Sequence, residues 1–494
     1  MLPLKTQAIF LIGVEISLIL KKMDIVLLHR NLRIKDNQAL YYGSQNQKYL
    51  VIYLFDKDYW NSNGKSSIQF QFAYDCLVSL DNELKELRSN IHIFEGNLYS
   101  LQEWIIRNYP KANIHFNHST DIDYFRSQLN SFKQFFNAHD QFHTYSDHGI
   151  QLDNFDRDNW SKHWHKIMDQ PLKLNPKANL HWLDVDIPAL NKFDPKIKDH
   201  TPLNMQIQKG GSLEADRLLD SFLFERCEGY SKKMSSPIDA ENSCSRLSPH
   251  IAFGSISIRQ IYQKLTDFFP VSNHKSDLNS FRKRLYWHCH FIQKLETEPE
   301  LEFNSMHSMC DELRPNFDSE IVERWIQGKT GFPFLDACIL YLKEYGWINF
   351  RMRAMIMSFA SYNLWQPWQK TSPLLAKLFV DYEPGIHISQ VQMQSGVTGI
   401  NLPRIYSVSK QSMDHDINAN WIKRVIPELQ SSDSESIHYA NLGKQYIEPI
   451  TDLRKSSKAA REKIWSIRSD IKFKNIAKKV YLKHGSRMRR RRTA

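Results

Sequence analysis

Short apolar runs alternate with longer amphipathic stretches from Asp24 to about Tyr145. In the amphipathic stretches apolar residues recur every three or four positions, which predicts helices, most clearly over residues 68–88. The apolar runs predict strands at residues 25–28, 50–55, 91–94 and 114–116. This alternation predicts a parallel sheet with right-handed helical crossovers, and therefore a Rossmann-like α/β domain over residues 24–146. No G-x-G-x-x-G follows any of these strands, so the dinucleotide fingerprint of such domains is absent.

The pattern changes twice beyond residue 146. Residues 147–208 are polar and contain five prolines, which favours a long surface connector with one short helix around residues 160–168. From residue 209 to about 470 helical periodicity dominates, which predicts an all-helical second domain. Its expected helices cover residues 213–224, 257–268, 280–296, 318–325, 334–345, 352–365 and 372–379.

The positive charge of the chain is concentrated at its end. The net charge is +11, yet residues 451–494 contain 16 Lys and Arg against 3 Asp and Glu, so the rest is near neutral. We expect residues 471–494 to form a basic tail. Such a tail is either a solvated end or a source of phosphate attraction without sequence specificity.

Composition excludes several classes of protein. Six cysteines without a C-x-x-C pair argue against a disulfide scaffold, a zinc ribbon and a local iron–sulfur motif, and fit a reducing compartment. We expect no bound metal. No run of eighteen apolar residues is present, so we expect a soluble, cytoplasmic protein without a membrane span. Residues 1–23 are apolar but interrupted by Glu15, and we interpret them as an extension or an overlong start rather than a targeting signal.

Three stretches of the helical part carry candidate chemistry. In residues 243–254, hydroxyls beside Arg246 precede an expected helix, which is typical of a capped helix or of an anion site. Residues 325–333 only superficially resemble a phosphate loop, and in residues 346–353 Arg351 and Arg353 point in different directions on one helix. Residues 380–399 combine two acids, a glycine and His387, which indicates either a polar ligand site or a structural histidine.

Several motifs together resemble the photolyase/cryptochrome flavoproteins. They are R-N-L-R-I-K-D-N-Q-A-L at residues 30–40, S-R-L-S-P at 245–249, the stretches 325–333 and 346–353, R-I-Y at 404–406 and I-P-E-L at 426–429. The resemblance covers about residues 24–476, in the order of the family. It implies an N-terminal α/β antenna domain and a helical C-terminal domain that holds FAD in a bent conformation. A second, antenna chromophore of unknown identity is possible.

The resemblance also assigns residues to the cofactor. Tyr230, Ser245, Arg246, Leu247 and Ser248 match positions that hold the FAD phosphates and ribityl chain, and His387 matches the position facing flavin N5. The other implied cofactor contacts are Trp347, Arg353, Asp381, Tyr382 and Glu383.

The implied activity is light-driven repair of DNA carrying UV lesions. Reduced FAD would pass an electron to a flipped-out pyrimidine dimer, with Trp287, His387 and the relay residue Trp368 as catalytic residues. Trp287 matches a dimer-stacking tryptophan and Arg404 a phosphate-binding arginine. The expected DNA contacts are Arg284, Trp287, Phe350, Arg351, Met393 and Arg404.

Several positions depart from the family pattern. The usual pocket glutamate is Arg284, the pocket asparagine is Phe350 and a second stacking tryptophan is Met393. Of the three relay tryptophans one remains, as Trp368, and the other two positions read Val391 and the neighbourhood of Pro315. An alternative relay could use Trp365, Trp368, Tyr362 and Tyr382, although core packing also explains Trp365 and Tyr362.

Three functions stay open at this point. The first is a monomeric DNA photolyase of a divergent bacterial type. The second is a cryptochrome-like light sensor without repair activity, and the third is a flavoprotein or nucleic-acid-binding relic without photochemistry.

Overall fold

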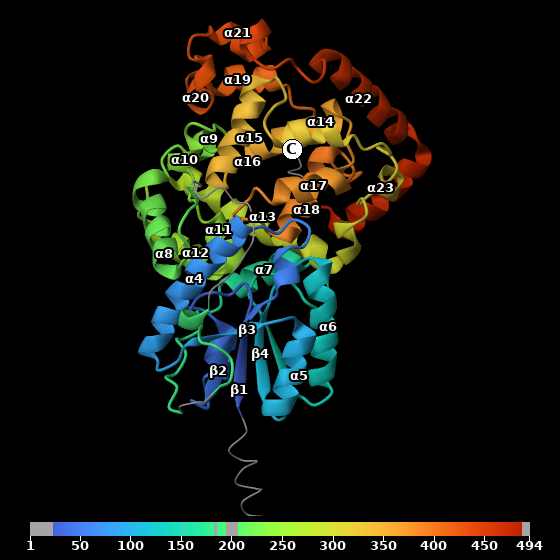
Figure 1. Cartoon of the computed structure of the whole chain (residues 1–494). Coiled ribbons are helices and arrows are strands. Elements are labelled where there is room, and N and C mark those ends of the chain that lie inside the picture. Colours follow the sequence, from blue (N-terminus) through green and yellow to red (C-terminus); the bar gives the residue numbers. More distant parts are fainter. Residues whose placement is uncertain (1–22, 154, 182–184, 194–205, 487–494) are drawn as a thin grey trace, which may run out of the picture.

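The computed structural model describes residues 23–153, 155–181, 185–193 and 206–486. An α/β domain carries a helical domain at one end of its sheet (Figure 1). The expected fold class is therefore confirmed. The predicted extension falls almost wholly outside the described residues, as do residues 487–494 of the basic tail.

The sheet has five parallel strands in the order β3-β2-β1-β4-β5. The strands are β1 Asp24–Leu28, β2 Tyr49–Phe55, β3 Ile91–Glu95, β4 Asn113–His118 and β5 Phe142–Ser146. The helices of this domain are α2 Gln38–Gly43, α3 Lys57–Trp60, α4 Ser67–Glu86, α5 Leu98–Asn108 and α6 Asp123–Asn137. Strand order reverses between β1 and β4, and loops after both strands reach the edge that faces the helical domain.

The central strands are buried on both faces because helices cover the sheet on both sides. Every residue of β1 is buried, from Asp24 to Leu28. β5 was not predicted, because in this edge strand only Phe142 is buried and the apolar signal is correspondingly weak.

Part of the expected connector runs beside the sheet, whereas Trp160, Trp164 and Met168 of its helix are buried in the core of the helical domain. The connector contains the predicted helix, α7 Trp160–Met168, and an isolated bridge pairs Ala189 with His92 beside β3. The Ile93 amide donates to the Pro188 carbonyl at 2.8 Å, which ties the connector to the sheet.

The second domain contains helices and no β-strand in its described residues. Its longer helices are α8 Ser212–Ser221, α12 Ile258–Phe268, α13 Lys275–Thr297, α14 Ser319–Ile326, α15 Pro333–Tyr345, α16 Phe350–Ser358, α17 Trp368–Ala376, α18 Pro384–Ser395, α19 Val408–His415, α22 Leu453–Ser469 and α23 Ile471–His484. The shorter ones are α9 Tyr230–Lys233, α10 Ala240–Ser243, α11 Ser248–Phe253, α20 Asn420–Val425 and α21 Ser434–Tyr439. In the described residues no helix is long and apolar enough to cross a membrane.

The basic C-terminal stretch differs from the tail that we expected. Residues 471–484 form α23, whose Phe473, Val480 and His484 are buried against the domain (Figure 1). Lys483 pairs with Glu298 at 2.9 Å, and the Phe473 ring stacks on His307 with centroids 3.7 Å apart. A helical stripe of apolar residues among the lysines therefore holds this segment in place, and its charges form part of the domain surface.

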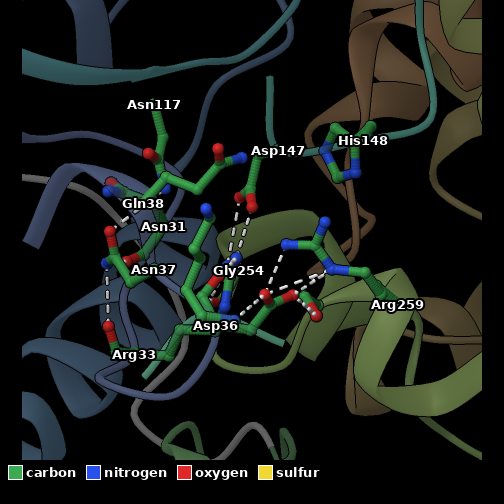
Figure 2. A network of polar contacts seen from close by, with 12 residues as sticks. Asn31, Arg33, Asp36, Asn37, Gln38, Asn117, Asp147, His148, Gly254 and Arg259 are labelled. Atoms are coloured by element: carbon green, nitrogen blue, oxygen red, sulfur yellow. Dashed lines mark hydrogen bonds and ion pairs between the residues drawn. The ribbon is translucent and has the colours of Figure 1, made fainter. Parts of the chain in front are cut away.

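A polar network joins the two domains along the segment after β1 (Figure 2). Arg33 Nη1 donates to Asp147 Oδ2 and to the Gly254 carbonyl, both at 3.0 Å. The Asp36 carboxylate accepts from Arg259 Nε at 3.0 Å and from Ser257 Oγ at 2.7 Å. The R-N-L-R motif at residues 30–33 thus begins an interdomain connection that the sequence alone did not reveal.

Candidate functional site

Arg246 is a half-buried cation without an acidic partner in the described residues. Its Nε donates to Gln208 Oε1 at 3.0 Å, and its guanidinium lies 4.0 Å from the centroid of the Trp347 ring. No ion pair to Arg246 occurs within the described residues, and burial lowers the pKa of its guanidinium. Its backbone φ of 61° is left-handed, a strain of about 1–2 kcal/mol for a residue with a side chain. Uncompensated charge and strain together indicate a binding site for an anion.

Four further residues predicted beside Arg246 lie around the same chain segment. Tyr230 is buried against Phe222 and Phe281, and Ser248 begins α11. The expected helix cap is wrong, because Leu247 occupies the cap position and the Ser245 hydroxyl accepts from the Leu247 amide at 3.4 Å. The hydroxyls of Ser245 and Ser248 therefore make no cap to the helix and are available to a ligand.

Arg353 and Asp381 form the second part of the site. The Arg353 Nη1 and Nη2 atoms each donate to one Asp381 oxygen at 2.9 Å, the parallel arrangement that fixes both groups most firmly. Arg353 Nε donates to the Ile348 carbonyl at 2.6 Å. Nearby, Asn349 donates to the Met234 carbonyl while its Oδ1 is buried without a hydrogen bond, an acceptor that a bound group could satisfy.

His387 stands one turn into α18 in a defined protonation state. Its Nε2 lies 3.1 Å from both the hydroxyl and the carbonyl oxygen of Ser372. Because a carbonyl only accepts, Nε2 carries the proton and Nδ1 is left as an acceptor. Burial lowers the pKa of His387 to about 4, so the ring is neutral at pH 7.

Tyr382 and Glu383 face the α/β domain. The Tyr382 carbonyl accepts from Arg30 Nη2 at 2.6 Å, and Glu383 Oε2 lies 3.0 Å from Arg30 Nη1. Burial raises the pKa of Glu383 to about 7, although Arg30 opposes the shift. These two residues, predicted to contact a cofactor, thus connect the cofactor segment to Arg30.

Two sequence models match the chain, one per domain. Residues 24–150 match the model described as DNA photolyase, and residues 281–466 match the FAD binding domain of DNA photolyase. Together they cover more than half of the chain, in the order of the family.

The chain belongs to the photolyase/cryptochrome family.

Curated relatives and solved structures agree with this assignment. A deoxyribodipyrimidine photo-lyase from Buchnera aphidicola (subsp. Baizongia pistaciae) is 25% identical over 84% of this chain and 91% of its own length. One from Alkalihalophilus pseudofirmus is 29% identical over 51% of this chain, which spans about half (54%) of that relative. A bacterial class III photolyase from Agrobacterium tumefaciens shares the fold, with a TM-score of 0.78 and 21% identity over 91% of this chain and 98% of its own.

The site residues fit the FAD that binds to this family's helical domain. Arg246 with Ser245 and Ser248 supplies donors for a diphosphate, and the planar Trp347 ring is held by that same arginine. The Arg353–Asp381 pair, the free Asn349 oxygen and neutral His387 supply polar groups for a flavin ring. The donor set therefore suits an anionic dinucleotide with a polar aromatic ring.

The predicted DNA-contacting residues come from three packed helices, α13, α16 and α18, and the loop after them. Trp287 is partly exposed, its ring 5.8 Å from Phe291 at an angle of 28°. Phe350 is 51% exposed at the start of α16, and Arg404 is exposed while its carbonyl accepts from Ser358 Oγ. Arg284 is exposed, whereas Arg351 and Met393 are partly exposed. All six residues are at least partly exposed, and whether they bind DNA stays a prediction.

The candidate relay residues differ in their surroundings. Trp368 is buried, and its Nε1 donates to Ser305 Oγ at 3.0 Å. Trp365 has the Arg314 guanidinium and the Lys463 ammonium each 4.6 Å from its ring centroid. Two adjacent cations oppose a positive charge on an oxidised indole, so Trp368 is the better relay residue. Tyr362 OH is buried without a hydrogen bond to receive its proton, which disfavours Tyr362 as well.

The second chromophore stays a prediction. In open α/β sheets ligands bind where the strand order reverses, here between the ends of β1 and β4. Side chains occupy this edge: His29 stacks on Phe125 with centroids 3.9 Å apart, and Asp121 accepts from Tyr59 at 2.7 Å. A photolyase from Sulfolobus tokodaii, crystallised with two FAD molecules, shares the fold with a TM-score of 0.74 and 22% identity over 90% of this chain and all of its own.

Sequence reasoning missed Lys65 and Asp121 and gave Arg30 no role. Arg30 lies inside a family motif, which is a usable signal, but its partner is 353 positions away in the sequence at Glu383. Lys65 and Asp121 lie in loops, where hydrophobic periodicity carries no information.

Proposed function

We propose that this protein binds FAD in its helical domain and uses blue light to split UV-induced pyrimidine dimers in DNA. The observation that carries the proposal is the convergence of unpaired donors around Arg246 with the Arg353–Asp381 pair and neutral His387. The names of the relatives support the same activity.

In this proposal the residues of the chain bind FAD and orient it. Arg246, Ser245 and Ser248 bind the diphosphate, and Asp381 holds the Arg353 guanidinium flat and in one orientation. His387 offers Nδ1 as an acceptor because Ser372 fixes the proton on Nε2. Bound FAD supplies light absorption and the transferable electron, whereas the protein supplies geometry and excludes water.

The proposed DNA-contacting residues recognise the shape and charge of DNA. A flipped dimer stacks on Trp287, which Phe291 supports from behind, and Arg404 and Arg351 bind phosphates. Aromatic stacking contributes about 1–3 kcal/mol per base in single-strand binding, enough to offset much of the cost of extracting a damaged base.

The test is repair by the reduced, FAD-loaded protein of oligonucleotides that carry a cyclobutane dimer or a six-four lesion. We expect restored pyrimidines under blue light and none in the dark, with loss of repair in Trp287→Ala. An exposed tryptophan variant, Trp465→Ala, is the matched control. Unchanged lesions of both kinds after illumination would contradict the proposal.

A second function, light sensing without repair, is favoured by one observation. Arg284 occupies the position of the family's pocket glutamate, exposed and 3.8 Å from Met234 Sδ, so no acid is supplied there. A cryptochrome from Synechocystis shares the fold with a TM-score of 0.75 and 19% identity over 89% of this chain and 99% of its own. A light-induced change in flavin absorption without repair of either lesion would favour sensing.

We further infer a monomer in the cytoplasm. All six cysteines are free, which suits a reducing compartment. Sedimentation velocity of the purified protein tests the monomer, and cell fractionation tests the location.

A further inference from the structure

Four side chains meet at the carboxyl edge of the sheet and bury an ionic cluster. His29 follows β1, Tyr59 and Lys65 follow β2, and Asp121 follows β4. Asp121 is at the centre: its oxygens lie 3.1 Å from Lys65 Nζ, 2.8 Å from His29 Nε2 and 2.7 Å from Tyr59 OH. The side chains of Lys65 and Asp121 are 3% and 1% exposed, so these charges have been removed from water.

The cluster extends into the helical domain at one segment. Lys65 Nζ lies 4.3 Å from the Tyr59 ring centroid and 5.2 Å from the Tyr382 ring centroid. Tyr382 approaches the loop before Lys65 so closely that a Cβ on Gly64 would be 3.0 Å from its hydroxyl. Arg30, adjacent to His29, donates to the Tyr382 carbonyl and pairs with Glu383.

Tyr382 lies near the start of residues 381–387, the segment that contains the expected flavin contacts Asp381 and His387. Asp381 precedes it and holds Arg353, and the His387 ring lies 5.3 Å from the Tyr382 ring. A shift of the Tyr382 backbone or ring would therefore move both side chains that face the expected flavin. A helix alone does not prevent such a shift, because α18 begins only after Glu383.

Stability does not explain the charges of this cluster. A buried ion pair is often no more stabilising than apolar residues of the same volume, whereas it can enforce one arrangement among several. The side chains at this edge also contact one another, since His29 stacks on Phe125 and Asp121 accepts from Tyr59. Holding a distant segment in one position is a role that fits both observations.

We propose that Lys65, Asp121 and Arg30 are positioning residues that hold residues 381–387, and through them Asp381 and His387, against the flavin. The proposal rests on the FAD site proposed above. It predicts that weakening the cluster loosens this segment and alters the bound flavin without removing any residue that touches FAD.

The experiment compares Lys65→Met with Arg259→Met in the full-length protein. Arg259 is the matched control, because it forms an ion pair of similar burial that crosses from the helical domain to Asp36 of the α/β domain, without contact to residues 381–387. Two readouts are used: hydrogen exchange of peptides covering residues 381–387, and the midpoint potential of the bound FAD.

We expect Lys65→Met to increase exchange in residues 381–387 by about tenfold or more, the signature of local opening, and to shift the potential. Arg259→Met is expected to change neither readout, even if it unfolds more easily. Asp121→Asn is the second variant and should reproduce Lys65→Met, while Lys65→Arg should restore much of the parent behaviour.

Equal changes in Lys65→Met and Arg259→Met, or no change in residues 381–387, would overturn the proposal. If the parent protein takes up no FAD, the proposed function fails at that step. The hydrogen-exchange comparison still decides in that case whether the cluster holds the segment, so the two failures are distinguishable.

Discussion

The sheet edge and the centre of the helical domain both bury charged groups, but they neutralise them differently. At the edge, charged side chains form buried ion pairs: Asp121 with Lys65, Asp36 with Arg259, Asp147 with Arg33. In the helical domain buried Arg314 and half-buried Arg246 have carbonyl, amide and ring partners and no carboxylate partner in the described chain. We interpret the paired charges at the sheet edge as contacts that fix neighbouring segments to each other. The unpaired cation Arg246 instead indicates a site for an anionic ligand.

The largest loss of stability is expected when a buried ion pair at the sheet edge loses one of its charges. Asp36→Asn keeps the left-handed backbone that asparagine tolerates (φ 54°) but leaves Arg259 buried without a counter-charge. We expect a loss of about 3–5 kcal/mol of unfolding free energy, measured by urea denaturation. Lys35→Ala, which removes the exposed pair with Asp216, should cost less than about 1 kcal/mol. Equal losses would show that burial does not separate the two pairs.

Replacing the unpaired cation Arg246 is expected to weaken ligand binding rather than to lower stability. Arg246→Gln should weaken FAD binding by about ten- to a hundredfold, since hydrogen bonds to charged groups contribute about 1.5–3 kcal/mol. Its unfolding free energy without FAD should hardly change, because no ion pair is broken. Titration of flavin fluorescence measures affinity, with exposed Arg217→Gln as control. Unchanged affinity would remove Arg246 from the site.

Within the helical domain, the two candidate relay tryptophans are expected to differ in their effect on the rate of flavin photoreduction. Trp368→Phe should slow photoreduction of the flavin by about tenfold or more, equivalent to about 1.4 kcal/mol of barrier. Trp365→Phe should have a smaller effect, because Arg314 and Lys463 flank that ring. Transient absorption after a light pulse measures both rates. A larger effect of Trp365→Phe would reverse the assignment.

A comparable effect is expected for the pH dependence of stability. His387 has a folded pKa of about 4, lowered by burial from 6.5, so the unfolded chain binds the proton first as pH falls. The stabilisation is complete above pH 6.5 and is lost as pH falls towards 4, by about 2 kcal/mol between pH 7 and 5. His387→Asn should remove that part of the decline in urea midpoints, and exposed His139→Asn should not. An unaltered decline in His387→Asn would contradict the buried neutral ring.

The periodicity of apolar residues predicted the central sheet and most long helices. It failed for helices that are buried on most sides and for helices that bury only a narrow stripe. α18 was not recognised as a helix because residues on most of its sides are buried, which leaves no polar stripe. In α23 a narrow stripe of Phe473 and Val480 was hidden among lysines.

The family motifs predicted which residues belong to the site. They did not predict the contacts, charges and protonation that these residues have in the folded structure. Arg246 and His387 were chosen by family position, and their unpaired charge and fixed proton are properties of the packed structure. The direction of Glu383 towards Arg30 depends on how two domains meet, which no local pattern encodes.

The most direct test of this account is the absorption spectrum of the purified full-length protein, with the pigment identified after denaturation. We predict one FAD per chain, lost or strongly reduced in Arg246→Gln and retained in Asp36→Asn at temperatures where that variant is folded. A colourless protein that also takes up no added FAD would contradict the account.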